Sequence, residues 1–303
     1  MNSRSTANVL ADALSRPDAG LAFAALFWSG NFVAGRALAD QIDPVSLNFW
    51  RWALALAVLL PVSWRALAAS RAALRTSWSR IALLGLTGVA AFHTCVYFAL
   101  AATTATSALL LLSLAPVFIV LATWLAHGEA PSAGELAGIV VSLAGAGVLV
   151  TKGSLDALLA LRLDTGALWM LVALLIWAAY SVLLRRRIPG VPPLALHTAT
   201  VIAGLAWMLP AYGTRVAVGE TTALTWTGAL GIGYIAVFAS AIAFFLWIRG
   251  VGRLGPNRAG MFIHLMPVFG AILAALFLGE RIAMFHVAGA ALVFAGLALG
   301  NRR

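Results

Sequence analysis

Charged residues are scarce in this sequence. Asp, Glu, Lys and Arg make up 10% of the 303 residues, whereas 62% are hydrophobic and the mean hydropathy is +0.97. Soluble domains carry about 25% charged residues, so the composition excludes a soluble domain and indicates a chain that lies in a bilayer. Because a membrane span needs about 20 apolar residues, ten spans would leave no room for a sizeable domain outside the membrane.

Cysteine is almost absent as well. Cys95 is the only one, and it lies within an apolar run. A single cysteine excludes an intramolecular disulfide and a cysteine-based metal cluster. Residues 1–17 lack the continuous apolar core of a cleaved signal, and we therefore expect the first span to be retained.

Catalytic and nucleotide-binding motifs are missing too. The sequence contains no HExxH, no GxSxG and no GxxxxGK[ST] phosphate loop, and no Asp or Glu lies deep in an apolar run. We therefore expect no enzyme, no ATP-driven pump, no metal site and no cofactor. No ladder of repeated polar groups is present either, which disfavours a channel.

Apolar runs between charged residues, prolines and glycines predict an all-α, polytopic membrane protein of ten helices. Residues 155–163 are apolar enough to lie along the membrane interface. The predicted spans are 20–38, 46–65, 79–100, 104–126, 133–151, 165–184, 193–213, 225–248, 256–278 and 282–300.

The distribution of basic residues predicts the orientation. Although the net charge is +10, the Lys and Arg residues lie at helix ends and in connections rather than on one surface, which argues against a nucleic-acid partner. An inside N-terminus places fourteen of the twenty in the cytoplasm, so we expect a bacterial inner-membrane protein with both termini cytoplasmic. These are Arg4, Arg16, Arg65, Arg71, Arg75, Arg80, Arg185, Arg186, Arg187, Arg249, Arg253, Arg258, Arg302 and Arg303.

An internal repeat divides the chain. Residues 115–129 and 266–280 both contain Pro-Val-Phe near the start and Gly-Glu at the end, displaced by 151 positions, and Trp28 and Trp177 are displaced by 149. We predict a cytoplasmic segment 1–19, a first repeat 20–152, a connection 153–164 and a second repeat 165–301. Since each repeat has five spans, the two would be inverted in the membrane, the arrangement that permits alternating access to a central site.

These residues carry a family resemblance. FWSGNFVAGR (27–36), NFWRWALA (48–55) and the paired Pro-Val-Phe and Gly-Glu blocks resemble the drug/metabolite transporter superfamily, and within it the EamA-type ten-helix exporters. The chain is most similar to bacterial aromatic amino-acid exporters. The resemblance implies a secondary transporter that exports amino acids and related small metabolites; a multidrug or other metabolite exporter and a channel-like uniporter are the alternatives.

Polar and aromatic residues deep in the spans are the candidates for a substrate cavity, because such groups should face protein or water. Trp28 and Trp177 either line this cavity or pack between helices, and the sequence is compatible with both roles. His93 and His264 could take part in a proton-linked step or simply bond a neighbouring helix. The predicted cavity residues are Trp28, Asn31, His93, Tyr97, Ser113, Trp177, Tyr180, Ser240, Phe244 and His264.

Other residues are candidates for hinges and gates. Pro116 and Pro267 lie near the middle of the fourth and ninth spans, where each removes a helical hydrogen bond and predicts a kink or hinge. Glu129 and Glu280 end the same spans and are expected to form caps or gate ion pairs. Arg51 is expected to reach the membrane surface or pair with a nearby carboxylate. The expected partners are a small-molecule substrate and the lipid bilayer, with the chain a monomer or homodimer.

Overall fold

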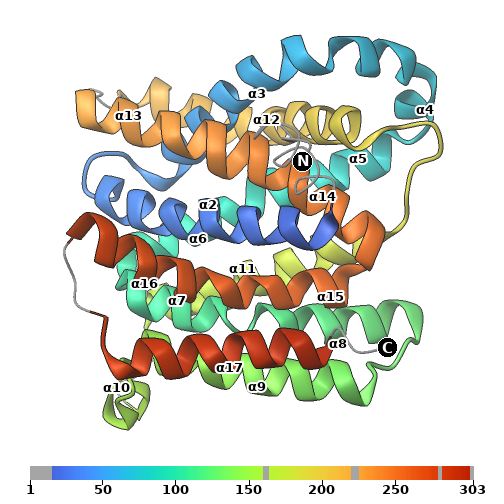
Figure 1. Cartoon of the computed structure of the whole chain (residues 1–303). Coiled ribbons are helices and arrows are strands. Elements are labelled where there is room, and N and C mark those ends of the chain that lie inside the picture. The colour runs from blue at the N-terminus through green and yellow to red at the C-terminus, as the bar shows by residue number, and fades with distance from the viewer. Residues whose placement is uncertain (1–15, 160–163, 220–224, 279–281, 301–303) are drawn as a thin grey trace, which may run out of the picture.

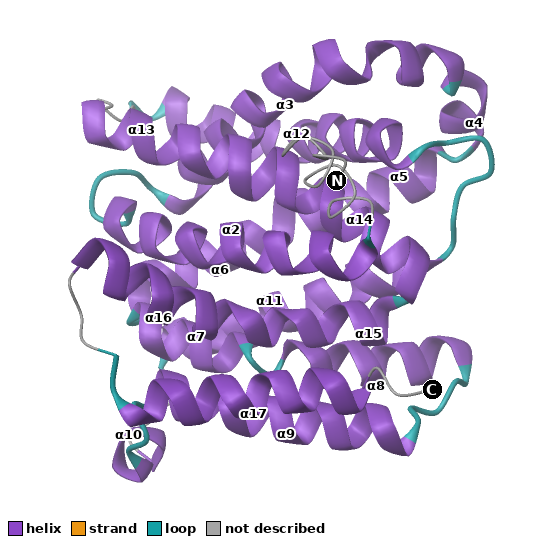
Figure 2. Cartoon of the chain, viewed as in Figure 1, coloured by secondary structure: helices purple, strands orange, loops and turns teal. Residues whose placement is uncertain are grey.

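The described residues of the computed structural model, 16–159, 164–219, 225–278 and 282–300, form a bundle of helices joined by short connections, with no strand among them (Figures 1 and 2). Eight helical stretches within these ranges are long and apolar enough to cross a membrane, and Met284–Gly300 is a shorter apolar helix. The ninth predicted span is helical but broken. The prediction of an all-helical membrane protein is confirmed.

The helices follow the predicted spans to within a few residues. In the first half they are α2 (Pro17–Leu38), α3 (Pro44–Ala69), α4 (Arg71–Thr76), α5 (Trp78–Leu84), η1 (Gly85–Ala91), α6 (Phe92–Ala102), α7 (Ala105–Leu112), α8 (Ala115–His127) and α9 (Ala133–Val150). The short α10 (Leu155–Leu159) lies in the connection. In the second half they are α11 (Thr165–Arg185), α12 (Pro193–Ala217), α13 (Trp226–Tyr234), η2 (Ile235–Ile242), α14 (Ala243–Leu254), α15 (Pro256–Met261), η3 (Phe262–His264), α16 (Leu265–Leu278) and α17 (Met284–Gly300).

Local sequence signals set several helix ends. The Asp43 carboxylate accepts hydrogen bonds from the backbone of Val45 and Ser46 at the start of α3. Ser132 and Glu135 form a capping box at the start of α9. Gly128 ends α8 in the left-handed conformation, with φ +69°. These signals place the starts and ends of the helices at the edges of the apolar runs.

The two spans with the matched prolines are the ones that break. The fourth span is interrupted at Ser113 and Leu114, between α7 and α8, and Pro116 lies in the first turn of α8. The ninth span passes through the 3-10 turn η3 before α16, in whose first turn Pro267 lies. Because proline cannot donate the helical hydrogen bond, both interruptions follow from the sequence. Bending at these points during transport stays a prediction.

The third and eighth spans also match each other. Each contains a π-helical segment in its middle, η1 in the third and η2 in the eighth. Such segments are rare and occur frequently at functional sites. In η1, a side chain on Gly88 would meet the ring of Tyr180 at 2.3 Å, so this glycine lets the third span pass close to α11.

Helices α9 and α17 lie side by side at one edge of the molecule (Figure 1). A Cβ atom on Gly138 would lie 2.6 Å from the carbonyl oxygen of Gly296, and one on Gly145 would lie 2.6 Å from that of Gly289. The earlier glycine of α9 therefore meets the later one of α17, so the two helices run antiparallel. Since Gly138 and Gly145 correspond to Gly289 and Gly296 in the repeat, the contact is two-fold symmetric, as an inverted repeat requires.

The outer surface of the bundle is apolar. Val62, Leu125 and Leu276 are 70%, 75% and 71% exposed, respectively. In water such large exposed side chains would favour aggregation, whereas against lipid tails they carry no cost. The bundle is therefore built for contact with lipid on its outside, and its polar side chains gather within.

Candidate functional site

Aromatic rings from both repeats meet at the centre of the bundle. The rings of Trp28 on α2 and Trp177 on α11 lie 5.5 Å apart, edge to face. Phe244 on α14 lies 5.5 Å from Trp28 and 5.7 Å from Trp177, and Tyr180 lies 5.3 Å from Trp177. The matched tryptophans of the repeats are thus in contact, within a continuous aromatic cluster.

Arg51 lies beside this cluster, fully buried. Its Nε donates to the Ser240 hydroxyl at 2.8 Å, and its Nη1 donates to the Tyr97 hydroxyl at 2.8 Å and to Asn31 Oδ1 at 3.3 Å. The expectation that Arg51 reaches the surface or pairs with Asp40 or Asp43 is wrong, because the side chain is 0% exposed. It points inward, where three predicted cavity residues hold it.

Two imidazoles flank the same centre. His93 packs between Phe92 and Trp52, with ring centroids 4.7 and 5.6 Å away. His197 on α12 lies with its Nε2 3.1 Å from the Ser240 carbonyl oxygen. His197 is not among the cavity residues predicted from the sequence, because it lies only one turn inside its span. The spacing of the prolines could have identified it. Pro44 and Pro61 of α3 match Pro193 and Pro210 of α12 at one displacement, which aligns His197 with Asn48.

The broken spans of the two repeats meet at His264. Its Nε2 is 2.7 Å from the carbonyl oxygen of Ser113, and its Nδ1 is 2.7 Å from the Ser142 hydroxyl on α9. His264 and Ser113 are 151 positions apart, so they are equivalent residues of the two repeats. Nearby, the Ser29 hydroxyl donates to the Met266 carbonyl at 2.9 Å. Backbone oxygens at both interruptions are therefore bonded by side chains from other helices.

A small cavity lies between these groups, with room for about one water molecule. It is mostly apolar, and both repeats contribute to it. Four predicted cavity residues line it, and it is too small for a metabolite in this conformation. Its lining is Trp28, Asn31, Phe32, Phe92, His93, Val96, Leu112, Trp177, Ile263 and Met266.

The buried polar groups around the cavity include several hydrogen-bond donors without a partner in the described part of the chain. They are Arg51 Nη2, Trp52 Nε1, Trp177 Nε1 and Trp247 Nε1. Asn48 Oδ1, an acceptor, also lacks a partner there, as do the ring nitrogens His93 Nδ1 and His197 Nδ1, which donate or accept according to the tautomer. Since buried polar groups are normally hydrogen-bonded, these groups are available to bond a ligand.

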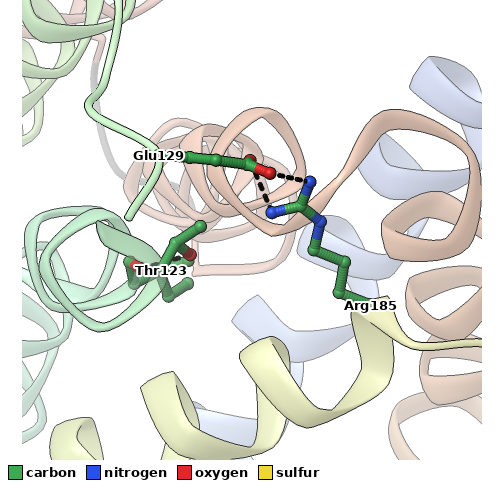
Figure 3. Close-up of polar contacts among 4 residues, drawn as sticks. Thr123, Glu129 and Arg185 are labelled. Carbon is green, nitrogen blue, oxygen red and sulfur yellow. Dashed lines mark hydrogen bonds and ion pairs between the residues drawn. The ribbon is translucent and has the colours of Figure 1, made fainter. Parts of the chain in front are cut away.

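An ion pair joins the two repeats at one end of the bundle. Arg185, at the end of α11, donates hydrogen bonds from Nη1 and Nη2 to the two carboxylate oxygens of Glu129, at 2.5 and 2.6 Å (Figure 3). The hydrogen bonds from Arg185 lower the pKa of the Glu129 carboxyl. Glu129 thus forms an ion pair between the repeats, while Glu280 and its neighbour Arg281 lie outside the described residues.

At the opposite end, Arg215 Nε of α12 lies 3.9 Å from Asp43 Oδ1 at the start of α3. The Thr225 hydroxyl donates to Gln41 Oε1 at 2.9 Å, and the Thr103 hydroxyl donates to Asp164 Oδ2 at 3.2 Å. The Thr225–Gln41 contact joins the two repeats, and the Thr103–Asp164 contact joins the first repeat to the residue that caps α11. Contacts between the two halves therefore lie at both ends of the bundle.

These features, an apolar outside, an inverted repeat and a small central cavity lined by both repeats, are those of a membrane transporter. The EamA-like transporter family matches the chain twice, over residues 17–151 and 164–302. The protein belongs to this family, and the resemblance seen in the sequence is confirmed.

Similar proteins agree with this assignment. An uncharacterized transporter of Archaeoglobus fulgidus is 27% identical over 92% of this chain and 95% of its own length. A probable terminal-alkyne amino-acid exporter of Streptantibioticus cattleyicolor is 28% identical over 96% of this chain and 95% of its own. A probable amino-acid metabolite efflux pump of Salmonella typhimurium is 26% identical over 54% of this chain and 56% of its own.

The fold is also found in a solved structure. A crystal structure superposes with a TM-score of 0.75 and 21% identity, over 94% of this chain and 95% of the other. At this identity the likeness concerns the fold, and it extends over the whole bundle.

Proposed function

We propose that the protein is a secondary carrier that exports neutral amino acids, aromatic ones in particular, and related small metabolites by alternating access. It would lie in a bacterial inner membrane with both termini in the cytoplasm. The observation that carries the proposal is the central site itself, which is lined by both repeats, with contacts between the two halves at each end.

The contacts at the two ends support an exchange of open sides. If the Glu129–Arg185 pair separates, the site gains access to one face, and if the contacts of Gln41 and Thr103 separate, it gains access to the other. Inverted repeats have two nearly equivalent packings of this kind. In this proposal, the conformation described here, with contacts made at both ends, is the intermediate between them.

The lining supports a substrate that is partly aromatic and partly polar. Trp28, Trp177 and Phe92 offer ring faces and edges, which pack well against another aromatic side chain. Asn31 and His93 offer hydrogen bonds. The names of the Streptantibioticus and Salmonella relatives refer to amino acids or their metabolites, and they favour the same class of substrate here.

Transport by purified protein in liposomes tests the proposal. Labelled aromatic, aliphatic and small neutral amino acids, together with a hydrophobic cationic dye, are offered with and without a pH gradient. We expect saturable uptake and counterflow for aromatic amino acids. Flux that rises linearly without counterflow would indicate a channel, and transport of the dye alone would indicate a drug exporter.

A further inference from the structure

Arg51 is a buried positive charge for which the described residues supply no negative partner. Its three hydrogen-bond partners, Ser240, Tyr97 and Asn31, are all neutral. A guanidinium stays protonated in proteins, and a buried charge without a counter-charge is costly. The described acidic residues all lie at helix ends, in first turns or in connections: Asp18, Asp40, Asp43, Glu129, Glu135, Asp156 and Asp164.

The guanidinium is held in a fixed position and is partly unused. It lies over the rings of Trp52 and Tyr97, with Cζ 5.1 and 5.7 Å from their centroids. Its Nη2 is buried and has no partner among the described residues. Such an arrangement leaves one arm of the guanidinium fork ready to donate, and a carboxylate is the group whose geometry matches that fork.

Arg51 is also one hydrogen bond away from the cavity. Asn31 accepts from Arg51 and lines the cavity. The indole N–H groups of Trp177 and Trp52 are further donors without a partner in the described part. Buried donors without a partner therefore gather near Arg51, and an anion with several acceptor lone pairs is the class of ligand that would bond them.

One acceptor for an amino group lies elsewhere in the cavity lining. Pro116 removes the helical donor that would bond the carbonyl of Leu112, and Leu112 lines the cavity. A zwitterion therefore has donors near Arg51 and a backbone acceptor at the interruption of the fourth span. The tryptophan rings remain for its side chain.

We propose that Arg51 binds the carboxylate of the transported substrate, so that the carrier accepts carboxylate-bearing small molecules and rejects amines that lack this group. The inference rests on the proposed carrier function. When the substrate enters, its carboxylate accepts from Nη1 and Nη2 of Arg51 in place of Asn31 Oδ1. The substrate then supplies the negative charge that the buried guanidinium lacks.

The first experiment compares competitors in counterflow of labelled phenylalanine through wild-type proteoliposomes. 3-Phenylpropionate keeps the carboxylate, whereas phenylalaninamide and phenethylamine lose it. We expect the acid to compete and both amines to be at least about tenfold weaker, as for the loss of a hydrogen bond to a charged group. Amines that compete as well as the acid overturn the role of Arg51 and leave the carrier function intact.

Absence of saturable uptake of every amino acid and monocarboxylate would refute the proposed function itself, and the role of Arg51 with it. The two failures are thus distinguishable in the same preparation.

The second experiment changes Arg51. Arg51→Met removes the charge at similar length, and we expect the purified protein to fold, because an apolar side chain avoids the cost of burying a charge. It should lose its preference for the acid over the amide by about tenfold or more. Arg51→Lys keeps the charge without the fork and should keep the preference with a raised KM.

Arg36→Met is the matched control. Arg36 is exposed near the end of α2, where it donates to the Leu100 carbonyl oxygen, and its loss should leave the selectivity unchanged. A folded Arg51→Met protein with the wild-type ratio of acid to amide transport would overturn the proposal. If this variant fails to fold, Arg51→Gln carries the same test, and an unchanged ratio there has the same meaning.

Discussion

At the scale of single residues, the matched tryptophans offer a direct test of the site. Trp28→Ala, Trp177→Ala and Tyr97→Ala should each raise the KM for transport by about tenfold, because each removes an aromatic or hydrogen-bonding surface of the cluster. The measurement is initial uptake in proteoliposomes. Trp64→Ala is the control, since Trp64 is 65% exposed on the lipid-facing side of α3. Normal kinetics in all three variants would refute the cavity.

A second prediction concerns the Glu129–Arg185 ion pair. Glu129→Gln should favour the conformation that is open at this end, because the neutral amide no longer attracts the guanidinium. The readout is maleimide labelling of Val96→Cys, a cavity position, in a Cys95→Ser background. We expect labelling from the cytoplasmic face to rise several-fold. The reversed pair, Glu129→Arg with Arg185→Glu, should return labelling to the wild-type level.

Glu135→Gln is the control for this change, because Gln also supports the capping box at the start of α9. The wild-type pair should also respond to pH. Since the pKa of Glu129 is lowered by Arg185, the contact is present at neutral pH and is lost as the pH falls through that lowered pKa. Labelling that is equal in wild type and Glu129→Gln at neutral pH would contradict a gating role.

The sequence showed which residues are deep in the spans but not which way they face. Depth follows from the position of a residue along an apolar run, and for Trp28, Trp177 and His264 it was enough to place them centrally. Arg51 lies about one turn inside its span, where both the surface and the interior are within reach of a long side chain. Its inward direction depends on Tyr97 and Ser240, which come from helices far away in the sequence.

At the scale of helices, close packing of α9 against α17 depends on glycine. Gly145→Ala should destabilise the protein by about 1–3 kcal/mol, because its Cβ would overlap the backbone of Gly289. Gly147 lies two residues further along α9, and a Cβ atom there would have nothing within 4 Å. Gly147→Ala should therefore be neutral or stabilising, since Ala favours helix. Thermal unfolding in detergent measures both. Equal melting temperatures would show that this crossing tolerates a larger separation.

The sequence predicted the helices well and their irregularities only in part. Apolar run lengths and end caps such as Asp43 and the Ser132–Glu135 box are local, so the spans agree with the structure. The prolines predicted the two interruptions. The π-helical segments η1 and η2 carry no proline. In η1, Gly85 and Gly88 lie where α12 and α11 approach closely. These approaches belong to the packing and not to the local sequence.

At the scale of the molecule, the inverted repeat makes a simple prediction about sides. Ala130 and Ala283 occupy similar places, just before α9 and α17. In a Cys95→Ser background, Ala130→Cys should be labelled by an impermeant maleimide only in inverted vesicles, and Ala283→Cys only in intact cells. Labelling of both from the same face would rule out the inverted arrangement in the membrane and, with it, alternating access.

The two halves are not identical at the centre, and the differences have an energetic meaning. Arg51 and Asn48 of α3 align with Thr200 and His197 of α12, and Ser113 aligns with His264. In a perfectly repeated chain, the forms open to either compartment would have the same free energy inside the protein. Any difference in free energy between the two open forms of this carrier must therefore arise at such unmatched positions and at the contacts at the two ends. A swap of Arg51 and Thr200 between the halves would shift the equilibrium toward the form that is open to the other compartment.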